Sequence, residues 1–158
     1  MTRSIRTKLV LTLLVLCASA CSPGFKAATP PGFVKLDNDY DDYDFRATNA
    51  DGLVMGVREL DHDPVGEDAF WLKAIKNKMR TQAGYALLGE TAVTTQSGLK
   101  GTQLRFGHDH DGNNPHLYFI TLFVTPKKLF LLEAGGTKKL MLANKAKIAA
   151  TIQAFRLN

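Results

Sequence analysis

The sequence has very little cysteine, with two in 158 residues, Cys17 and Cys21, both close to the N-terminus. Beyond Cys21 no thiol remains for a disulfide, a thiolate metal site or a cysteine nucleophile. A domain built from the rest of the chain must therefore be stabilised by its apolar core alone. The length after Cys21 suits a single domain of ordinary size.

The motifs of several large enzyme classes are also absent. The sequence contains no phosphate-binding loop, no dinucleotide fingerprint and no G-x-S-x-G nucleophile elbow. No catalytic residues are therefore assigned, and the sequence favours a protein that is not an enzyme.

Net charge is low once the start of the chain is set aside. The whole chain carries +5, but Arg3, Arg6 and Lys8 lie in the first 20 residues, which contain no acidic residue. Without them 17 Lys+Arg face 15 Asp+Glu, which leaves about +2. This excess is too small to indicate nucleic-acid binding.

The first 20 residues have the three parts of a secretory signal peptide. A basic start is followed by an apolar run over residues 9–16 and then by the small residues Ala18, Ser19 and Ala20. The apolar run is too short to span a bilayer, which needs about 20 apolar residues. We therefore expect residues 1–20 to be removed, with cleavage before Cys21.

The residues around the cleavage site resemble a known processing motif. Ala18-Ser19-Ala20-Cys21 resembles the lipobox of bacterial lipoproteins, although Ala18 stands where that family usually has Leu. The resemblance implies that Cys21 carries palmitate-type acyl chains, which anchor the protein to a membrane. Ser22, a residue other than Asp, implies by the same resemblance the outer membrane, facing the periplasm. An ordinary cleaved secretory signal is the alternative.

A polar segment rich in proline separates Cys21 from the first apolar pattern. We expect residues 21–31, the lipidated Cys21 included, to form a tether. Its ten residues after the cysteine would reach at most about 35 Å when extended. The folded domain is then expected over residues 32–158.

The apolar pattern of residues 32–158 predicts an α+β domain with a single antiparallel sheet and two packed helices. Period-2 alternation marks strands, and i, i+3, i+4 spacing marks helices. The expected order is β-β-β-α-β-β-β-β-α, with Gly135 and Gly136 ending the last strand. The elements in this order are strands over 33–36, 43–47 and 53–60, a helix over 67–82, strands over 85–95, 99–107, 116–125 and 129–134, and a helix that begins at Lys138 or Leu142 and ends at Phe155.

This order of elements resembles the PsbP-like fold, which includes DcrB-type envelope lipoproteins. The resemblance covers residues 32–155 and rests on Gly32-Phe33, on Tyr43-Asp44-Phe45, on the helix with Phe70 and Trp71, and on the closing helix with Ile148, Ile152 and Phe155. Members of the fold bind other proteins. The resemblance therefore implies a non-enzymatic accessory protein with an envelope protein as partner, held through the sheet face or a groove between sheet and helix. Trp71 and Phe70 are the candidate partner surface, because an exposed aromatic would mark one.

A histidine-rich loop supports an alternative function. Three of the four histidines, His108, His110 and His116, lie within nine residues and are accompanied by Asp111. Imidazole with carboxylate suits zinc, copper or nickel. The loop therefore predicts a divalent-metal or small-ligand site, although Asp-Gly and Asn-Asn-Pro are also ordinary turn sequences. No other cofactor is expected.

Overall fold

The structure is a computed structural model, and it describes residues 23–37, 42–109 and 112–158. In chain order its elements are β1 (Phe25–Lys26), β2 (Phe33–Lys35), β3 (Phe45–Asn49), β4 (Val54–Asp61), α1 (Asp68–Thr81), β5 (Ala86–Thr94), β6 (Lys100–His108), β7 (His116–Val124), β8 (Lys128–Thr137), α2 (Lys138–Ala143), α3 (Lys145–Ala154) and β9 (Arg156–Leu157). Cys21, His110 and Asp111 lie outside the described residues.

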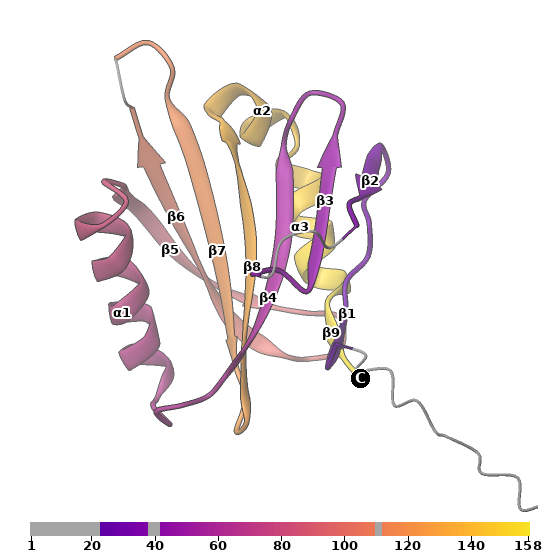
Figure 1. Cartoon of the computed structure of the whole chain (residues 1–158), viewed down its shortest axis with the longest axis vertical. Coiled ribbons are helices and arrows are strands. Elements are labelled where there is room, and N and C mark those ends of the chain that lie inside the picture. The colour runs from indigo at the N-terminus through magenta and orange to yellow at the C-terminus, as the bar shows by residue number, and fades with distance from the viewer. Residues whose placement is uncertain (1–22, 38–41, 110–111) are drawn as a thin grey trace, which may run out of the picture.

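Seven strands form one antiparallel sheet in the order β2-β3-β4-β8-β7-β6-β5, as Figure 1 shows. The predicted α+β fold with a large antiparallel sheet is therefore confirmed. The centre of this sheet is the β4-β8-β7 triplet, in which β8 pairs along its length with both neighbours. The order of elements differs from the prediction in two respects. A short strand is added at each end, β1 at the start and β9 at the finish, and the C-terminal helix is divided into α2 and α3.

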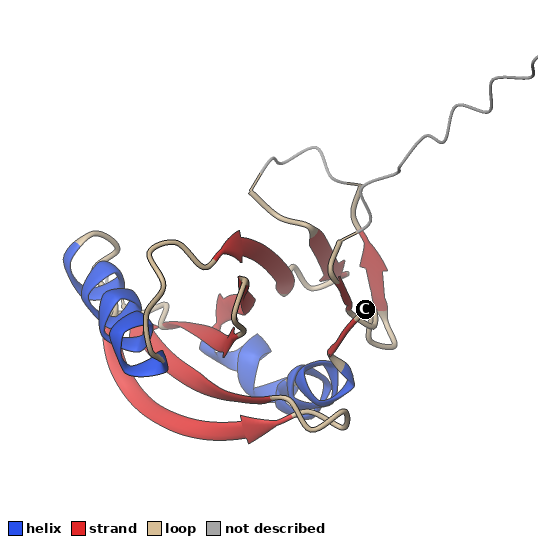
Figure 2. Ribbon diagram, turned by 90° about the horizontal axis from the view of Figure 1, so that it is seen from below, coloured by secondary structure: helices blue, strands red, loops and turns tan. Residues whose placement is uncertain are grey.

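The sheet is apolar on both faces, because alternate residues of β7 and β8 point to opposite sides. Phe119 and Phe123 of β7 join Phe130 and Leu132 of β8 in one cluster of buried residues. The residues between them, such as Ile120 of β7, join a second cluster. The first face is covered by α2 and α3, and the second by α1, which lies on the other side of the sheet in Figure 2.

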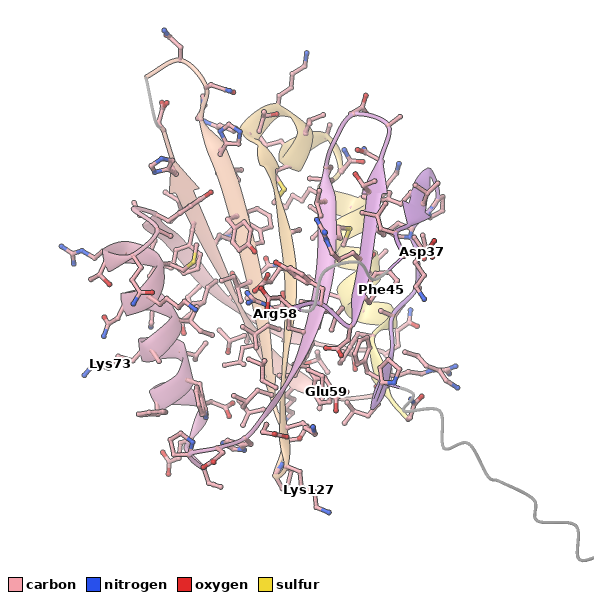
Figure 3. All side chains as sticks on the ribbon, in the orientation of Figure 1. Asp37, Phe45, Arg58, Glu59, Lys73 and Lys127 are labelled. Atoms are coloured by element: carbon pink, nitrogen blue, oxygen red, sulfur yellow. The ribbon has the colours of Figure 1, made fainter. Side chains whose placement is uncertain are left out.

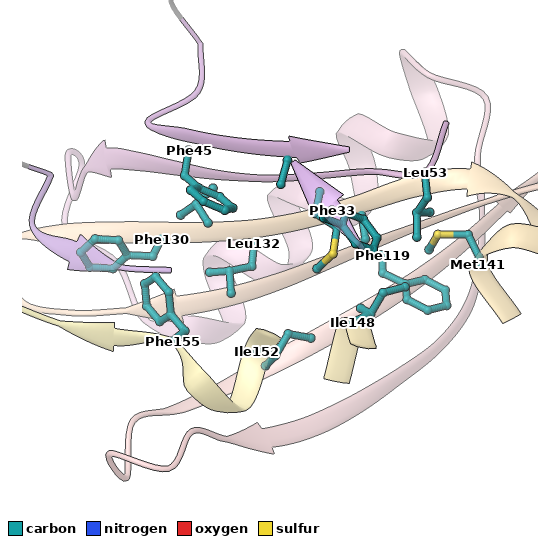
Figure 4. Close-up of a cluster of buried hydrophobic side chains, with 14 of the residues drawn as sticks. Phe33, Phe45, Leu53, Phe119, Phe130, Leu132, Met141, Ile148, Ile152 and Phe155 are labelled. Carbon is teal, nitrogen blue, oxygen red and sulfur yellow. The ribbon is translucent and has the colours of Figure 1, made fainter. Parts of the chain in front are cut away.

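The face under α3 carries the larger core. Ile148 and Ile152 of α3 project onto Phe119 and Leu132 of the sheet (Figure 4). Phe155, fully buried at the end of α3, lies with its ring centroid 5.3 Å from that of Phe123 and parallel to it. This cluster closes the end of the domain at which β1 and β9 meet.

Two predicted boundaries were wrong for local reasons. The last strand does not end before Gly135 and Gly136, because β8 continues through them, paired with β4 as far as Gly135 and with β7 through both. The C-terminal helix is divided at Asn144, whose side-chain amide donates to the carbonyl oxygen of Leu140 at 3.0 Å. A buried asparagine that bonds to the preceding turn competes with continued helical pairing.

Part of the segment expected to be a tether is folded onto the body. Phe25 and Lys26 form β1, which pairs antiparallel with Leu157 and Arg156 of β9. The Phe25 ring is only 6% exposed and contacts Phe155, with 5.5 Å between ring centroids. The folded body therefore includes residues well before position 32, and β1 and β9 are additions to the predicted order.

None of the helices in the described residues is both long enough and apolar enough to cross a membrane.

Replacing Phe25 with alanine tests whether β1 is packed onto the folded body. A residue in a free tether would contribute nothing to stability, whereas removing a buried phenylalanine costs about 3–5 kcal/mol. We expect Phe25→Ala to lower the free energy of unfolding in urea by about that amount. Val34→Ala, at a largely exposed side chain of β2, is the control and should change it by less than about 0.5 kcal/mol. Equal stability of the two variants would contradict the packing of β1.

Candidate functional site

The main candidate site is a groove between α1 and the second face of the sheet. Its volume is about 410 Å³, which lies within the range of small-ligand and side-chain pockets. Its wall is mostly apolar, and the side chains come from one face of α1 and from β4, β7 and β8. The lining residues include Trp71, Ala74, Ile75, Met79, Ile120, Leu122, Leu129 and Leu131.

The position of α1 beside the sheet is set by the linker that precedes it. His62, which follows β4, is buried, and its Nδ1 lies 2.7 Å from the carbonyl oxygen of Thr125. The backbone N–H of Gly66 donates to Nε2 of the same ring at 2.9 Å. His62 therefore connects the start of the helix to the turn between β7 and β8, and so fixes one end of the groove.

A polar group built around Glu133 adjoins the apolar wall. Glu133 is 4% exposed and projects from β8 on the groove face. Its carboxylate accepts hydrogen bonds from the hydroxyls of Tyr43 and Tyr118, each at 2.7 Å, and forms an ion pair with Arg58. Arg58 projects from β4 over the middle of the sheet, whereas Lys73 points away from the sheet on α1 (Figure 3).

Two glycines make room for the tyrosine rings of this group. Gly56 is the register partner of Glu133, and a Cβ at Gly56 would lie 2.6 Å from the Tyr43 ring. A Cβ at Gly135 would lie 2.7 Å from the Tyr118 ring. Any larger residue at either position would displace a ring that donates to Glu133. The sheet sequence is therefore adapted to the polar group, and Gly135 has this role rather than that of a strand breaker.

The electrostatics of the group keep the hydroxyls of the two tyrosines protonated, because the pKa of each is raised. Burial, followed by the negative charge of Glu133, raises the pKa of Tyr118 far above its ordinary value. The same two causes raise the pKa of Tyr43. Burial acts to lower the pKa of Arg58, but its hydrogen bond to Glu133 and the charge of that carboxylate together raise it. Glu133 thus holds three donors in fixed positions.

Trp71 and Phe70, the predicted partner surface, are both at this site. Trp71 is half-buried and lines the groove. Phe70 is 53% exposed and stands edge-on to the Trp71 ring, with 5.1 Å between centroids. The structure therefore places an exposed aromatic beside the groove. The use of this surface by a partner stays a prediction.

The predicted metal ligands are only partly described. His108 and His116 are register partners at the open ends of β6 and β7. Nδ1 of His108 lies 3.0 Å from the carbonyl oxygen of Gly84, and Nδ1 of His116 lies 2.8 Å from that of Asn114. The described part of the chain contains no cluster of three or more metal-ligating side chains. Because His110 and Asp111 are outside it, the metal site stays a prediction.

Sequence reasoning missed Glu133 and its partners. The signal was a lone carboxylate inside the otherwise apolar strand sequence LFLLEA, because glutamate is rarely buried unless it is paired. The partners could not be found in this way. Arg58 of β4 and Tyr43, which precedes β3, come from a distant part of the sequence and meet Glu133 only in the folded sheet.

Comparison with known proteins shows the fold. The chain matches no protein-family model and no curated protein sequence. Among solved structures it is similar to LpqN of Mycobacterium tuberculosis, described as involved in cell envelope biogenesis, with a TM-score of 0.68, 14% identity and coverage of 88% of this chain and 87% of that one. It is also similar to the PsbP protein of the cyanobacterium Synechocystis, with a TM-score of 0.60, 11% identity and coverage of 85% and 87%.

A third similar structure is the Ran-binding protein Mog1p of Saccharomyces cerevisiae, with a TM-score of 0.55, 15% identity and coverage of 85% and 90%. At these identities the similarity concerns the fold alone. The chain thus has a PsbP-like fold, as the order of its elements indicated.

Replacing Tyr118 with phenylalanine tests the Glu133 group through pH. The raised pKa keeps the hydroxyl protonated in the folded state at pH values where the unfolded chain, with the ordinary value of 10.0, loses the proton. The contribution of the Tyr118 hydroxyl to the free energy of unfolding is therefore complete below pH 10 and decreases above it. Tyr118→Phe should cost about 1.5–3 kcal/mol at pH 8, because a hydrogen bond to a charged group is lost.

The same variant should lose less stability than the wild type between about pH 9 and pH 11, as urea unfolding at each pH would measure. An alkaline decrease of equal size in both proteins would contradict the assigned role of Tyr118.

Proposed function

We propose that this chain is a lipid-anchored protein of the bacterial envelope that has no catalytic activity and binds another envelope protein in the groove between α1 and the sheet. The observation that carries the proposal is the groove itself, which is apolar, open and bordered by the exposed ring of Phe70. Pockets with apolar walls and few polar groups bind apolar parts of a partner. The partner is expected to insert one or more apolar side chains there.

The fixed polar group supports binding more than catalysis. The carboxylate of Glu133 is occupied by two tyrosine hydroxyls and by Arg58. A general base must reach a substrate proton within hydrogen-bond distance, and this carboxylate already has three donors. The tyrosine and arginine side chains are instead positioned to give the groove a defined polar border that orients what enters it.

The proteins of similar fold support the class of function. LpqN is described as involved in cell envelope biogenesis, and Mog1p is described as binding another protein, Ran. The lipobox-like residues before Cys21 support the envelope location, with the outer membrane facing the periplasm as the finer proposal.

Filling the groove tests the binding proposal. Ala74 is an exposed residue of α1 that lines the groove, whereas the neighbouring Lys73 points away from the sheet. A photo-reactive residue at position 74 should cross-link one defined envelope protein in living cells. Ile75→Trp should abolish that product, because the larger side chain would occupy the groove that Ile75 lines.

The matched control is Lys73→Trp, which adds the same side chain to the outer side of the same helix. It should leave the cross-linked product at the wild-type level. Equal yields from Ile75→Trp and Lys73→Trp would rule out the groove as the binding site.

Metabolic labelling tests the anchor separately. Labelled palmitate should enter the wild-type protein and be absent from Cys21→Ser, because the thiol of Cys21 is the proposed acceptor. Incorporation that is equal in the two proteins would show that the anchor is not at Cys21.

A further inference from the structure

The body of the protein begins very close to the proposed anchor. The backbone N–H of Gly24 donates to a carboxylate oxygen of Glu59 at 2.7 Å, and Asn158 donates its N–H to the carbonyl oxygen of Gly24 at 3.0 Å. Gly24 is thus held on the body, three residues after Cys21. Three residues span at most about 11 Å, in place of the roughly 35 Å expected for a free tether.

One end of the molecule must therefore lie near the bilayer if Cys21 is acylated. The short β1–β9 sheet is at this end, together with the C-terminus and the turn between β7 and β8 (Figure 1). Lys127, in that turn, lies at the same end in Figure 3. The turn between β3 and β4 lies at the opposite end (Figure 1).

This end carries a hollow with two basic side chains. The hollow has a volume of about 480 Å³ and is lined by Lys26 and Arg156, with Gln96, Ser97 and Gln153 beside them. None of the described residues that line the hollow is acidic. Lys128, also at this end, is paired with Asp61 at 2.9 Å and with Glu59 at 3.4 Å, and so adds little free charge.

Lys26 and Arg156 are direct register partners across β1 and β9. Like charges that face each other across two strands destabilise the pairing. Both side chains are exposed, and neither forms an ion pair with another described residue. An anion bound between them would remove their repulsion.

We propose that Lys26 and Arg156 hold the phosphate of an anionic phospholipid headgroup in this hollow, so that the β1–β9 end of the body rests on the leaflet that carries the anchor. The proposal depends on acylation of Cys21, which is part of the proposed function. The short link to Cys21 supplies the proximity, and the two cations supply the attraction, since basic residues near an anionic leaflet are bound by its surface potential. The β3–β4 turn then faces the aqueous side.

The test uses the lipidated protein in vesicles and places a single fluorescent label at one of two exposed positions. Because Cys21 is acylated and the rest of the mature chain has no thiol, Thr94→Cys and Ala50→Cys each provide a unique labelling site. Thr94 ends β5, two residues before Gln96 of the lining of the hollow, and Ala50 lies in the β3–β4 turn. In phosphatidylcholine vesicles that contain phosphatidylglycerol, a quencher on the lipid headgroups should quench the label at position 94 more strongly than the label at position 50.

The double variant Lys26→Gln/Arg156→Gln removes the two charges. The ratio of docked to undocked orientations should then decrease about twenty-five-fold, since each basic residue near an anionic leaflet contributes roughly fivefold. Lys73→Gln/Lys139→Gln, which removes two exposed charges elsewhere, is the control and should leave this ratio unchanged. Pure phosphatidylcholine should give at least the loss seen in the double variant, because the exposed Lys127 at the same end then also loses its attraction to the leaflet.

Results of two distinguishable kinds would overturn the proposal. Equal quenching of the two labels in a palmitate-bearing protein, or an unchanged ratio in the double variant, would remove the headgroup site and leave the anchor intact. Absence of palmitate from the wild-type protein would remove the anchor and, with it, this orientation.

Discussion

The constraint on which the structure depends is the alternation of side chains along β7 and β8, which makes the centre of the sheet apolar on both faces. Phe119 and Phe123 point to one side of β7, and Ile120 and Leu122 point to the other. A sheet of this kind is stable only when both faces are covered. The two central strands therefore require a helical layer on each face of the sheet. The two layers differ from each other in how completely they cover their faces.

The unequal covers explain where a binding site can exist. On the first face, α3 and the β1–β9 sheet bury Phe25, Phe130 and Phe155 together, so this side is a closed core. On the second face, α1 buries only Leu72 of its own side chains among the described residues. The groove is the part of the second face that α1 leaves open, and the Glu133 group occupies the sheet next to it.

The sequence predicted the parts of the fold that local patterns determine. The strands from β2 to β8 and the helix α1 follow from period-2 and period-3.6 spacing, and the observed boundaries lie within a few residues of the expected ones. The β1–β9 pairing was missed because it joins residues far apart in the chain, and the lone Phe25 has no local pattern around it. The Glu133 group was missed for the same reason, since Tyr43 and Arg58 lie far from it in the chain and meet it only in the folded sheet.

The incomplete burial of the sheet-facing side chains of α1 has a consequence for binding. Burial of one leucine contributes about 1.5–3 kcal/mol, and the other sheet-facing residues of α1, such as Trp71, Ile75 and Met79, are only half-buried. An apolar side chain from a partner that enters the groove would complete the burial of these residues. The His62 contacts hold the start of the helix in place. The far end is held by the backbone hydrogen bond from Tyr85 to Met79 and by the ion pair of Lys76 with Glu90 of β5. The groove thus combines incompletely buried apolar side chains with a fixed polar border around Glu133.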